Sequence, residues 1–484
     1  MYSKVTSKVV FFLFISFTFI NCSKTENIPA DVAVNDFVWK GMNAYYYWQN
    51  NQPDLADTRF SSQNQLNTYL TGFSTPENLF ETLRYQPGTI DRFSWIVDDY
   101  LVLENSFQGI TLNNGMEFNL YLETNSNTQV YAVVRYIIPG SDAANKGVLR
   151  GMVFNAIDGN QLSTTNYREL LFGSNTSYVV NFAEYNSGNP TSNGDSKALT
   201  KTELQENPVA IAKIFDEGTS KIGYLLYNQF IANFDDELNA AFASFKSENI
   251  NDLIIDLRYN GGGSVRSATY LGSMVTGQFH EDLYTQEVWN EKVMEATPAD
   301  YFLNNFTNQI NNGIVTENIN SVGLARVYFI VTGDTASASE LVLNALSAYI
   351  EVNLVGSQTV GKQVGSITLY DSDNLQRTGA NLNQDHRYAM QPIVLEIKNA
   401  NGENNPNGYI PGEQIVEDFG QISGEINLGV LGEKSDPLLD KTITLITSGS
   451  RTYDKINRVV KKEQITNSKL QRPFSNDMYV EDFN

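Results

Sequence analysis

The stretch LIIDLRYNGGG, residues 253–263, is a short apolar run that ends in three glycines. The apolar run predicts a buried strand over 253–257, and the glycines let the backbone turn sharply and expose its N–H groups. Such groups can hold a phosphate, but no Gly-Lys-Ser/Thr follows, which argues against a nucleotide P-loop. The loop is therefore either an oxyanion hole or a plain connection.

Strands and helices alternate on both sides of this stretch. The pattern of residues 234–249 places Leu238, Phe242 and Phe245 on one side of a helix. Alternation of this kind predicts an α/β layer architecture for residues 205–445. Further strands are predicted at 221–230, 326–332 and 352–356, and a further helix at 340–349.

The segment TASASE, residues 335–340, lies between the predicted strand that ends at Thr332 and the helix that begins near Glu340. A serine at a strand-to-helix turn projects its hydroxyl outward, and the N–H of the next residue is free at the helix N-terminus. Both features would make Ser337 a suitable nucleophile, because they stabilise developing negative charge. An N-cap serine is the ordinary alternative.

The segment GSQTVGKQVG, residues 356–365, places Lys362 between glycines after a strand. Such a lysine is either an exposed loop residue or points inward. A serine nucleophile needs a base, and the chain has only two histidines, His280 and His386, neither in a catalytic context. A lysine base is attractive for this reason, provided that burial disfavours its charged form.

Residues 96–190 change to short alternating strands, predicted at 131–138 and 177–185. Between them lie the segments PGSDAA (139–144), GVLRG (147–151) and AIDG (156–159). This order of strand, turn, short helix, turn and strand resembles the PDZ module of bacterial proteases. Gly109 and Ile110 would then match the loop that binds a peptide carboxylate, while the peptide adds as a strand. Any small β-barrel with ordinary turns is the alternative.

Taken together, the motifs resemble the C-terminal processing peptidase (tail-specific protease) family of serine peptidases. Asn260–Gly263, Thr335–Glu340 and Gly361-Lys362 follow in the order of the family, and the lysine lies 25 residues after Ser337. The resemblance covers about residues 96–445. It implies a ClpP/crotonase-like protease core in which Ser337 attacks the peptide carbonyl to form an acyl-enzyme, with Lys362 as the base.

The resemblance also implies an oxyanion hole made by Gly262, Gly263 and the Ala338 N–H. Many members carry a glutamine four residues after the lysine, where this chain has Ser366. Ser366 as the residue that orients the lysine is therefore a hypothesis. No cofactor or metal is implied, and the expected partners are proteins or peptides with exposed C-termini.

Two other readings of the same residues stay open. One is a non-catalytic lipoprotein that binds peptides through the PDZ-like module. The other is a protease with a Ser-His relay, in which His280 or His386 is the base.

The first residues have the pattern of an export signal. Lys4 and Lys8 precede the apolar run Val9–Ile20, which is too short to span a bilayer comfortably. Cys22, the single cysteine of the chain, follows directly and resembles the acylated cysteine of bacterial lipoproteins. We expect lipidation of Cys22 and an exported, lipid-anchored protein of the bacterial cell envelope, periplasmic or in the outer membrane; a single membrane anchor is the alternative.

The 484 residues are too many for one hydrophobic core, and the formal net charge of −22 argues against nucleic-acid binding. Residues 27–95 show helical spacing, and Thr75 before Pro76 predicts a capped helix. The expected segments are a signal peptide at 1–21, an anchor linker and helical domain at 22–95, a PDZ-like domain at 96–190, the α/β protease core at 205–445 and a polar, solvated tail at 446–484.

Overall fold

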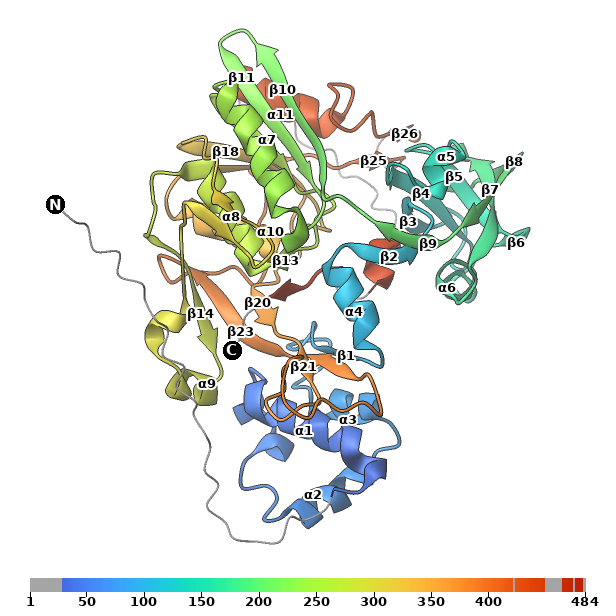
Figure 1. Ribbon diagram of the computed structural model, residues 1–484. Coiled ribbons are helices and arrows are strands. Elements are labelled where there is room, and N and C mark those ends of the chain that lie inside the picture. Colours follow the sequence, from blue (N-terminus) through green and yellow to red (C-terminus); the bar gives the residue numbers. More distant parts are fainter. Residues whose placement is uncertain (1–27, 421–422, 449–463, 473–474, 482–484) are drawn as a thin grey trace, which may run out of the picture.

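The computed structural model describes residues 28–420, 423–448, 464–472 and 475–481. Figure 1 shows a helical N-terminal part, an α/β core and a β-rich lobe. This arrangement confirms the expected multidomain α/β fold with a helical N-terminal region. Cys22 and the basic residues between 449 and 463 lie outside the described residues.

The core is a six-stranded sheet with the order β10-β11-β12-β18-β19-β24. Pairs from β11 to β24 are parallel, and β10 is antiparallel to β11. The predicted strands at 253–257, 326–332 and 352–356 are β12, β18 and β19. The strands are β10 (Val209–Glu217), β11 (Ser220–Tyr227), β12 (Asp252–Asp256), β18 (Arg326–Val331), β19 (Glu351–Gly356) and β24 (Glu413–Gln414).

Helices cover both faces of this sheet. Successive strand residues point to opposite faces, so Leu253 and Ile255 of β12 join one apolar cluster and Ile254 joins another. The first cluster includes side chains of α7 (Asp235–Ser247), α8 (Val265–Thr276) and α10 (Ala338–Ser347), and the second includes those of α11 (Pro437–Ser448). With both faces covered, the ends of β12 and β18 are held firmly.

A second sheet lies beside the core with the order β13-β28-β20-β23-β14-β15. Its second strand comes from the very end of the described chain, between two strands that are distant from it in sequence. The strands are β13 (Gly263–Ser264), β28 (Met478–Tyr479), β20 (Val364–Ser366), β23 (Ile393–Asn399), β14 (Leu283–Trp289) and β15 (Leu303–Asn305).

The β-rich lobe is a seven-stranded sheet around its own apolar core. It continues past residue 190, where its expected boundary lay, because β8 pairs with β7. Two short helices, α5 (Asp142–Asn145) and α6 (Tyr167–Phe172), complete it. The strands are β27 (Gln464–Asn467), β3 (Met116–Leu122), β4 (Val130–Ile137), β5 (Val153–Ile157), β6 (Asn160–Gln161), β7 (Ser177–Glu184) and β8 (Thr191–Thr200).

A thin connection joins the lobe to the core. Helix α4 (Tyr100–Phe107) leads into β2 (Ile110–Asn113), which pairs with β9 (Thr202–Gln205) in a sheet of its own. Figure 1 shows this pair between the lobe and the core. The chain therefore enters and leaves the lobe at one place, through β2 and β9. The other contacts between lobe and core are made by side chains and by the C-terminal segment.

The N-terminal part contains α1 (Ala33–Tyr45), α2 (Gln63–Leu70) and α3 (Pro76–Leu83). The expected cap of α3 is confirmed, since the Thr75 hydroxyl accepts the N–H of Asn78. Helix α1 packs so tightly on the three-stranded sheet of β1 (Trp95–Val97), β22 (Ala389–Gln391) and β21 (Leu369–Tyr370) that a Cβ at Gly41 would lie 2.1 Å from Met390 Cε.

The expectation of a solvated C-terminal tail is wrong for its described residues. Residues 464–472 and 475–481 supply β27, a 3-10 turn at Lys469–Gln471 and β28, and both Lys469 and Asp477 are buried. The hydrophilic composition was misleading because the polar side chains are paired inside the protein rather than with water.

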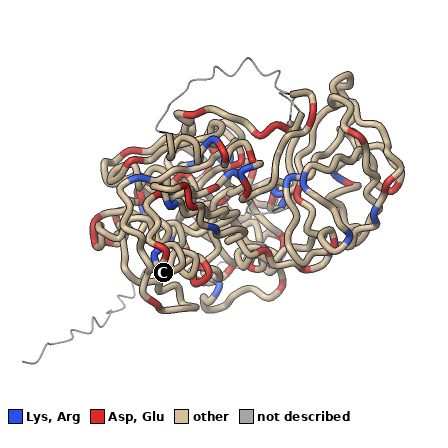
Figure 2. Tube along the Cα trace, turned by 90° about the horizontal axis from the view of Figure 1, so that it is seen from above, with Lys and Arg blue, Asp and Glu red and all other residues tan. Residues whose placement is uncertain are grey.

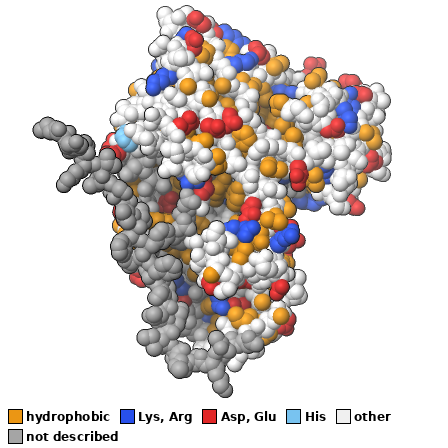
Figure 3. All heavy atoms as spheres, viewed as in Figure 1, with side chains coloured by type: hydrophobic (Ala, Val, Ile, Leu, Met, Phe, Trp, Pro, Cys, Tyr) orange, Lys and Arg blue, Asp and Glu red, His pale blue; other side chains and the backbone are white. Residues whose placement is uncertain are grey.

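The described part of the chain contains no helix with the length and apolar character needed to cross a bilayer. On the face in Figure 3, hydrophobic side chains are scattered among acidic and basic ones.

Candidate active site

The glycine loop begins directly after β12 and is stabilised by Asn260. The Asn260 side chain donates to the Tyr227 carbonyl and accepts the N–H of Gly262, each at 2.9 Å. Gly262 has a φ of 120°, and a Cβ there would lie 2.6 Å from the Cβ of Ser337. Only glycine allows this approach, so the loop and the serine motif, separate in sequence, are brought into contact.

Ser337 occupies the turn between β18 and α10. Its φ of 66° and ψ of −121° are unusual for a residue with a side chain, at a cost of about 1–3 kcal/mol. The side chain is buried, and among the described residues its Oγ has no hydrogen-bond partner. Ser337 is thus the N-cap residue of α10 by position, while its Oγ makes no hydrogen bond to the first turn of the helix.

Lys362 lies inside the protein rather than in an exposed loop. It is fully buried, and its Nζ lies 4.7 Å from the centre of the Phe93 ring. The same Nζ donates to Asp477 Oδ1 at 2.7 Å. The environment of the lysine thus combines an aromatic face with one carboxylate from the end of the chain.

Glu340 connects the serine loop to the lysine loop. Its carboxylate accepts the N–H groups of Ser337 at 3.0 Å, Gly361 at 2.8 Å and Lys362 at 2.8 Å, together with the hydroxyl of Thr359. Burial raises the pKa of Glu340, and these four hydrogen bonds offset part of that rise. One side chain therefore sets the position of both expected catalytic loops.

The N–H groups expected at the oxyanion hole are in different situations. The N–H of Gly262 is bonded to Asn260, whereas Ala338 is the first residue of α10, where N–H groups lack a partner within the helix. Gly263 belongs to β13 and pairs with Met478 of β28. The Ala338 N–H thus lies at a helix start, while that of Gly262 is engaged by Asn260 and Gly263 lies beside the C-terminal strand.

Ser366 does not have the partner proposed for it. Its hydroxyl donates to the Met478 carbonyl at 3.2 Å, and the carboxylate bonded to Lys362 is that of Asp477. No local sequence pattern points to this partner, because Asp477 lies 115 residues from the lysine.

Neither histidine is placed at the serine. His386 bonds to Asp371 at 2.9 Å and packs near the ring of Phe37. His280 is exposed and lines a small cavity with Phe306. These positions argue against a Ser-His relay.

The Gly109-Ile110 segment lies at the junction of lobe and core. The N–H of Gly109 donates to the Ser106 carbonyl at 3.0 Å, and Ile110 starts β2, which is outside the seven-stranded sheet. Ile110 nevertheless lines a cavity of about 430 Å³ that also contacts Met116, Phe118 and Leu171. The segment therefore borders an apolar cavity, and its role as a carboxylate-binding loop stays a prediction.

Buried ion pairs join the lobe to the loop that carries the site. Arg258, two residues after β12, donates to Asp256 at 2.6 Å and to Asp436 at 2.7 Å. It shares Glu417 with Arg150 of the lobe, at 3.2 and 2.8 Å. In Figure 2, Lys and Arg positions lie along the junction between lobe and core.

A second pair connects the lobe to the serine loop. Arg135 of β4 donates to Asp334 at 2.5 Å and lies over the ring of Tyr259. Asp334, three residues before Ser337, also accepts the Asn467 amide at 2.9 Å. Movement of the lobe relative to the core would therefore displace Asp334 and, with it, the serine loop.

Comparison with known proteins agrees with this geometry. The sequence model of peptidase family S41 matches residues 221–391, which contain Gly262, Ser337 and Lys362. The model of the peptidase S41 N-terminal domain matches residues 33–95.

Curated relatives support the same family. Carboxyl-terminal-processing peptidase 2, chloroplastic, from Arabidopsis thaliana is 25% identical over 300 residues, 60% of this chain and 53% of the relative. The carboxyl-terminal-processing protease of Picosynechococcus sp. is 24% identical over 275 residues, 55% of this chain and 58% of the relative. This chain thus matches little more than half the length of either relative.

The fold is also similar to that of a Bacteroides fragilis protein assigned to the S41 proteases. The TM-score is 0.63 at 22% identity, covering 86% of this chain and 97% of that one. This fold agrees with the two family matches and the curated relatives: the chain is similar to the proteins of peptidase family S41 and, among them, to the carboxyl-terminal-processing peptidases.

Proposed function

We propose that this protein is a serine endopeptidase in which Ser337 is the nucleophile and Lys362 the general base. The observation that carries the proposal is the buried Ser337 hydroxyl, which has no hydrogen-bond partner in the described part of the chain. Glu340 connects its loop to the loop of the buried lysine. A buried serine with a purely structural role would form a hydrogen bond through its hydroxyl, and a lysine with such a role would extend its amine to solvent. A ClpP/crotonase-like fold of the core is part of this proposal, and it rests on the motifs at Asn260–Gly263, Thr335–Glu340 and Gly361-Lys362.

The proposed reaction proceeds through an acyl-enzyme on Ser337. Ser337 Oγ attacks the peptide carbonyl carbon while its proton passes to a neutral Lys362 amine. The oxyanion is stabilised by the N–H of Ala338 at the start of α10, and the expected further donors are the N–H groups of Gly262 and Gly263. The C–N bond then breaks as Lys362 returns the proton to the leaving amine. Water attacks the acyl ester, again losing its proton to Lys362, and the proton returns to Ser337 Oγ.

Substrate selection is proposed for the β-rich lobe as a PDZ-like module. A PDZ module binds an extended C-terminus beside an edge strand and a helix. Here the cavity of about 430 Å³ lies among β2, β3 and α6, with the apolar side chains of Met116, Phe118 and Leu171 and the exposed Leu112 on its lining. The preferred substrates are therefore proteins with an apolar, accessible C-terminus.

Replacement of Ser337 or Lys362 by alanine is expected to lower cleavage of an unfolded protein with an apolar C-terminus by about 1,000-fold or more, because each removes a member of one catalytic unit. Cleavage is followed by gel densitometry, with thermal unfolding to verify the fold. His280→Ala and His386→Ala serve as controls and should retain activity. Cleavage that persists in Ser337→Ala would disprove the nucleophile, and binding without any cleavage by the wild type would favour a peptide-binding protein.

Glu340→Gln is expected to lower kcat by about 10- to 100-fold with little change in KM, because it weakens the link between the two loops without touching substrate. In the wild type, burial raises the pKa of Glu340, so on acidification its carboxylate becomes protonated at a higher pH than that of an ordinary glutamate does. Activity should therefore fall on acidification before pH 4.5 is reached. Glu295→Gln, an exposed change on α9 (Glu291–Ala296), is the control, and equal kcat in both variants would refute this role.

Leu112→Asp tests the proposed C-terminus site. The change places a charge in the apolar cavity and should raise KM about tenfold for a substrate with a free apolar C-terminus, with little effect when that C-terminus is blocked. Leu149→Asp is a matched control, because Leu112 and Leu149 are 60% and 62% exposed and Leu149 lies outside the cavity. Identical KM values for free and blocked substrates would exclude C-terminal recognition.

We further propose that the mature protein is anchored to the cell envelope through acylated Cys22, on the pattern of residues 4–22. Expressed in a bacterium that processes lipoproteins, the wild type should partition into the detergent phase of a two-phase extraction. The Cys22→Ser variant should not. Equal partitioning of the two proteins would rule out the anchor.

A further inference from the structure

The C-terminal segment occupies a gap beside the proposed nucleophile. Strand β28 runs parallel to β13, with Met478 opposite Gly263, and parallel to β20, with Tyr479 opposite Ser366. It is the strand that joins β13 to β20 in the second sheet. Strand β28 therefore lies where an extended substrate would have to bind, between the glycine loop and the lysine loop.

The backbone of this segment passes directly over the glycine loop. A Cβ on Gly261 would lie 1.7 Å from the Ser475 carbonyl oxygen. A Cβ on Gly262 would lie 2.8 Å from the Asp477 carbonyl oxygen and 2.9 Å from Ser337 Oγ. The main chain at Asp477 and the serine hydroxyl therefore meet at one point of the loop, as a bound peptide and a nucleophile would.

The Asp477 side chain is bonded to Lys362, the proposed base. Its Oδ1 accepts from Lys362 Nζ at 2.7 Å and its Oδ2 accepts from Trp95 Nε1 at 3.0 Å. Lys362 is fully buried and Asp477 is 3% exposed. The amine that would take the serine proton is thus held in an ion pair with a carboxylate of the C-terminal segment. The pair therefore opposes the reaction proposed for Lys362.

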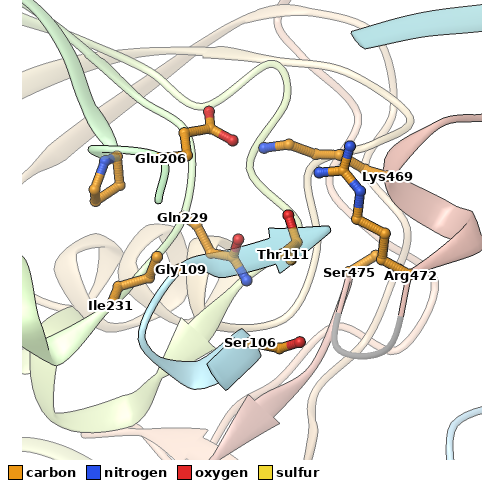
Figure 4. A pocket seen from close by; sticks show the side chains of 10 residues that line it. Ser106, Gly109, Thr111, Glu206, Gln229, Ile231, Lys469, Arg472 and Ser475 are labelled. Atoms are coloured by element: carbon orange, nitrogen blue, oxygen red, sulfur yellow. The ribbon is translucent and has the colours of Figure 1, made fainter. Parts of the chain in front are cut away.

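The preceding turn anchors the segment to the junction of lobe and core. Lys469 Nζ donates to the carbonyls of Asn228 and Tyr259 at 3.2 and 3.3 Å. Arg472 and Ser468 both bond to the buried Glu117 of β3. Figure 4 shows Lys469 and Arg472 directed across a small cavity that Gly109 and Thr111 line from the other side.

Further upstream, β27 adds to the edge of β3 in the lobe. The pairing is antiparallel, with Thr466 opposite Leu120 and Asn467 opposite Asn119. The same segment thus augments the sheet of the proposed PDZ-like lobe and fills the gap at the proposed active site. Strand addition is the ordinary way in which an extended peptide binds a sheet edge.

We propose that residues 475–481 are a pseudosubstrate bound in cis, which keeps the site inactive through Asp477 until a peptide strand displaces it. This proposal rests on the proposed peptidase function. It also specifies the binding mode, in which an incoming chain lies extended and parallel to β13 between the glycine loop and β20. The alternative is that Asp477 is a permanent positioning residue for Lys362.

The Asp477→Ala variant of the full chain distinguishes a pseudosubstrate from a positioning residue. Removal of the carboxylate releases the Lys362 amine from this ion pair, so kcat on an unfolded protein should rise about tenfold or more. A positioning residue would instead lower kcat when removed. Asp195→Ala, an exposed loss of the same charge in β8, is the control and should leave kcat unchanged.

A peptide with the sequence of residues 475–484 tests the binding site itself. Added to the Asp477→Ala protein, it should inhibit competitively, and the same peptide with alanine in place of the aspartate that corresponds to Asp477 should inhibit at least tenfold more weakly. A scrambled peptide should not inhibit. Lowered activity in Asp477→Ala, or no inhibition by the peptide, would overturn the proposal.

A readout without catalysis keeps this test apart from the proposed function. The labelled peptide should bind the Ser337→Ala, Asp477→Ala double variant, measured by fluorescence anisotropy, more tightly than it binds Ser337→Ala alone. Binding without cleavage in any variant would reject the peptidase and retain the cis-bound segment. Cleavage with equal peptide binding in the two proteins would reject the cis-bound segment and retain the peptidase.

Discussion

The site depends on one carboxylate, that of Glu340, which accepts three backbone N–H groups from two loops. Hydrogen bonds to a charged acceptor are the strong ones, and inside a protein they act at low dielectric. They hold Ser337 in a backbone conformation that it would not otherwise adopt, and they fix the start of the lysine loop. Because Glu340 lies in the first turn of α10, its charge also stabilises the helix N-terminus.

A second carboxylate, that of Asp477, acts on the same pair of loops from the far end of the chain. Glu340 holds the loops through their backbone, whereas Asp477 contacts the amine that the reaction would use. The two acids therefore have opposite consequences, since one assembles the site and the other occupies it. The segment that carries Asp477 also touches the serine loop through Asn467 and Asp334, so lobe, segment and site are physically continuous.

Sequence patterns predicted the local elements well. The strand before the glycine loop, the cap at Thr75 and the helix after Ser337 all follow from periodicity and capping chemistry, which act over a few residues. The C-terminal segment was misjudged because a polar stretch resembles a solvated one until its partners are known. Buried Lys469 shows the difficulty, since the carbonyls that receive it come from Asn228 and Tyr259.

The sequence by itself determined the α/β alternation, the glycine loop, the serine at a strand-to-helix turn and the spacing from Ser337 to Lys362. These are properties of neighbouring residues, and glycine's freedom or a helix start can be read from them directly. Only the tertiary structure decided that Gly262 meets Ser337, that Glu340 joins the two loops and that Asp477 reaches Lys362. Such contacts join residues up to 115 positions apart, and their energy comes from burial and charge in a shared interior, which leaves no local pattern in the chain.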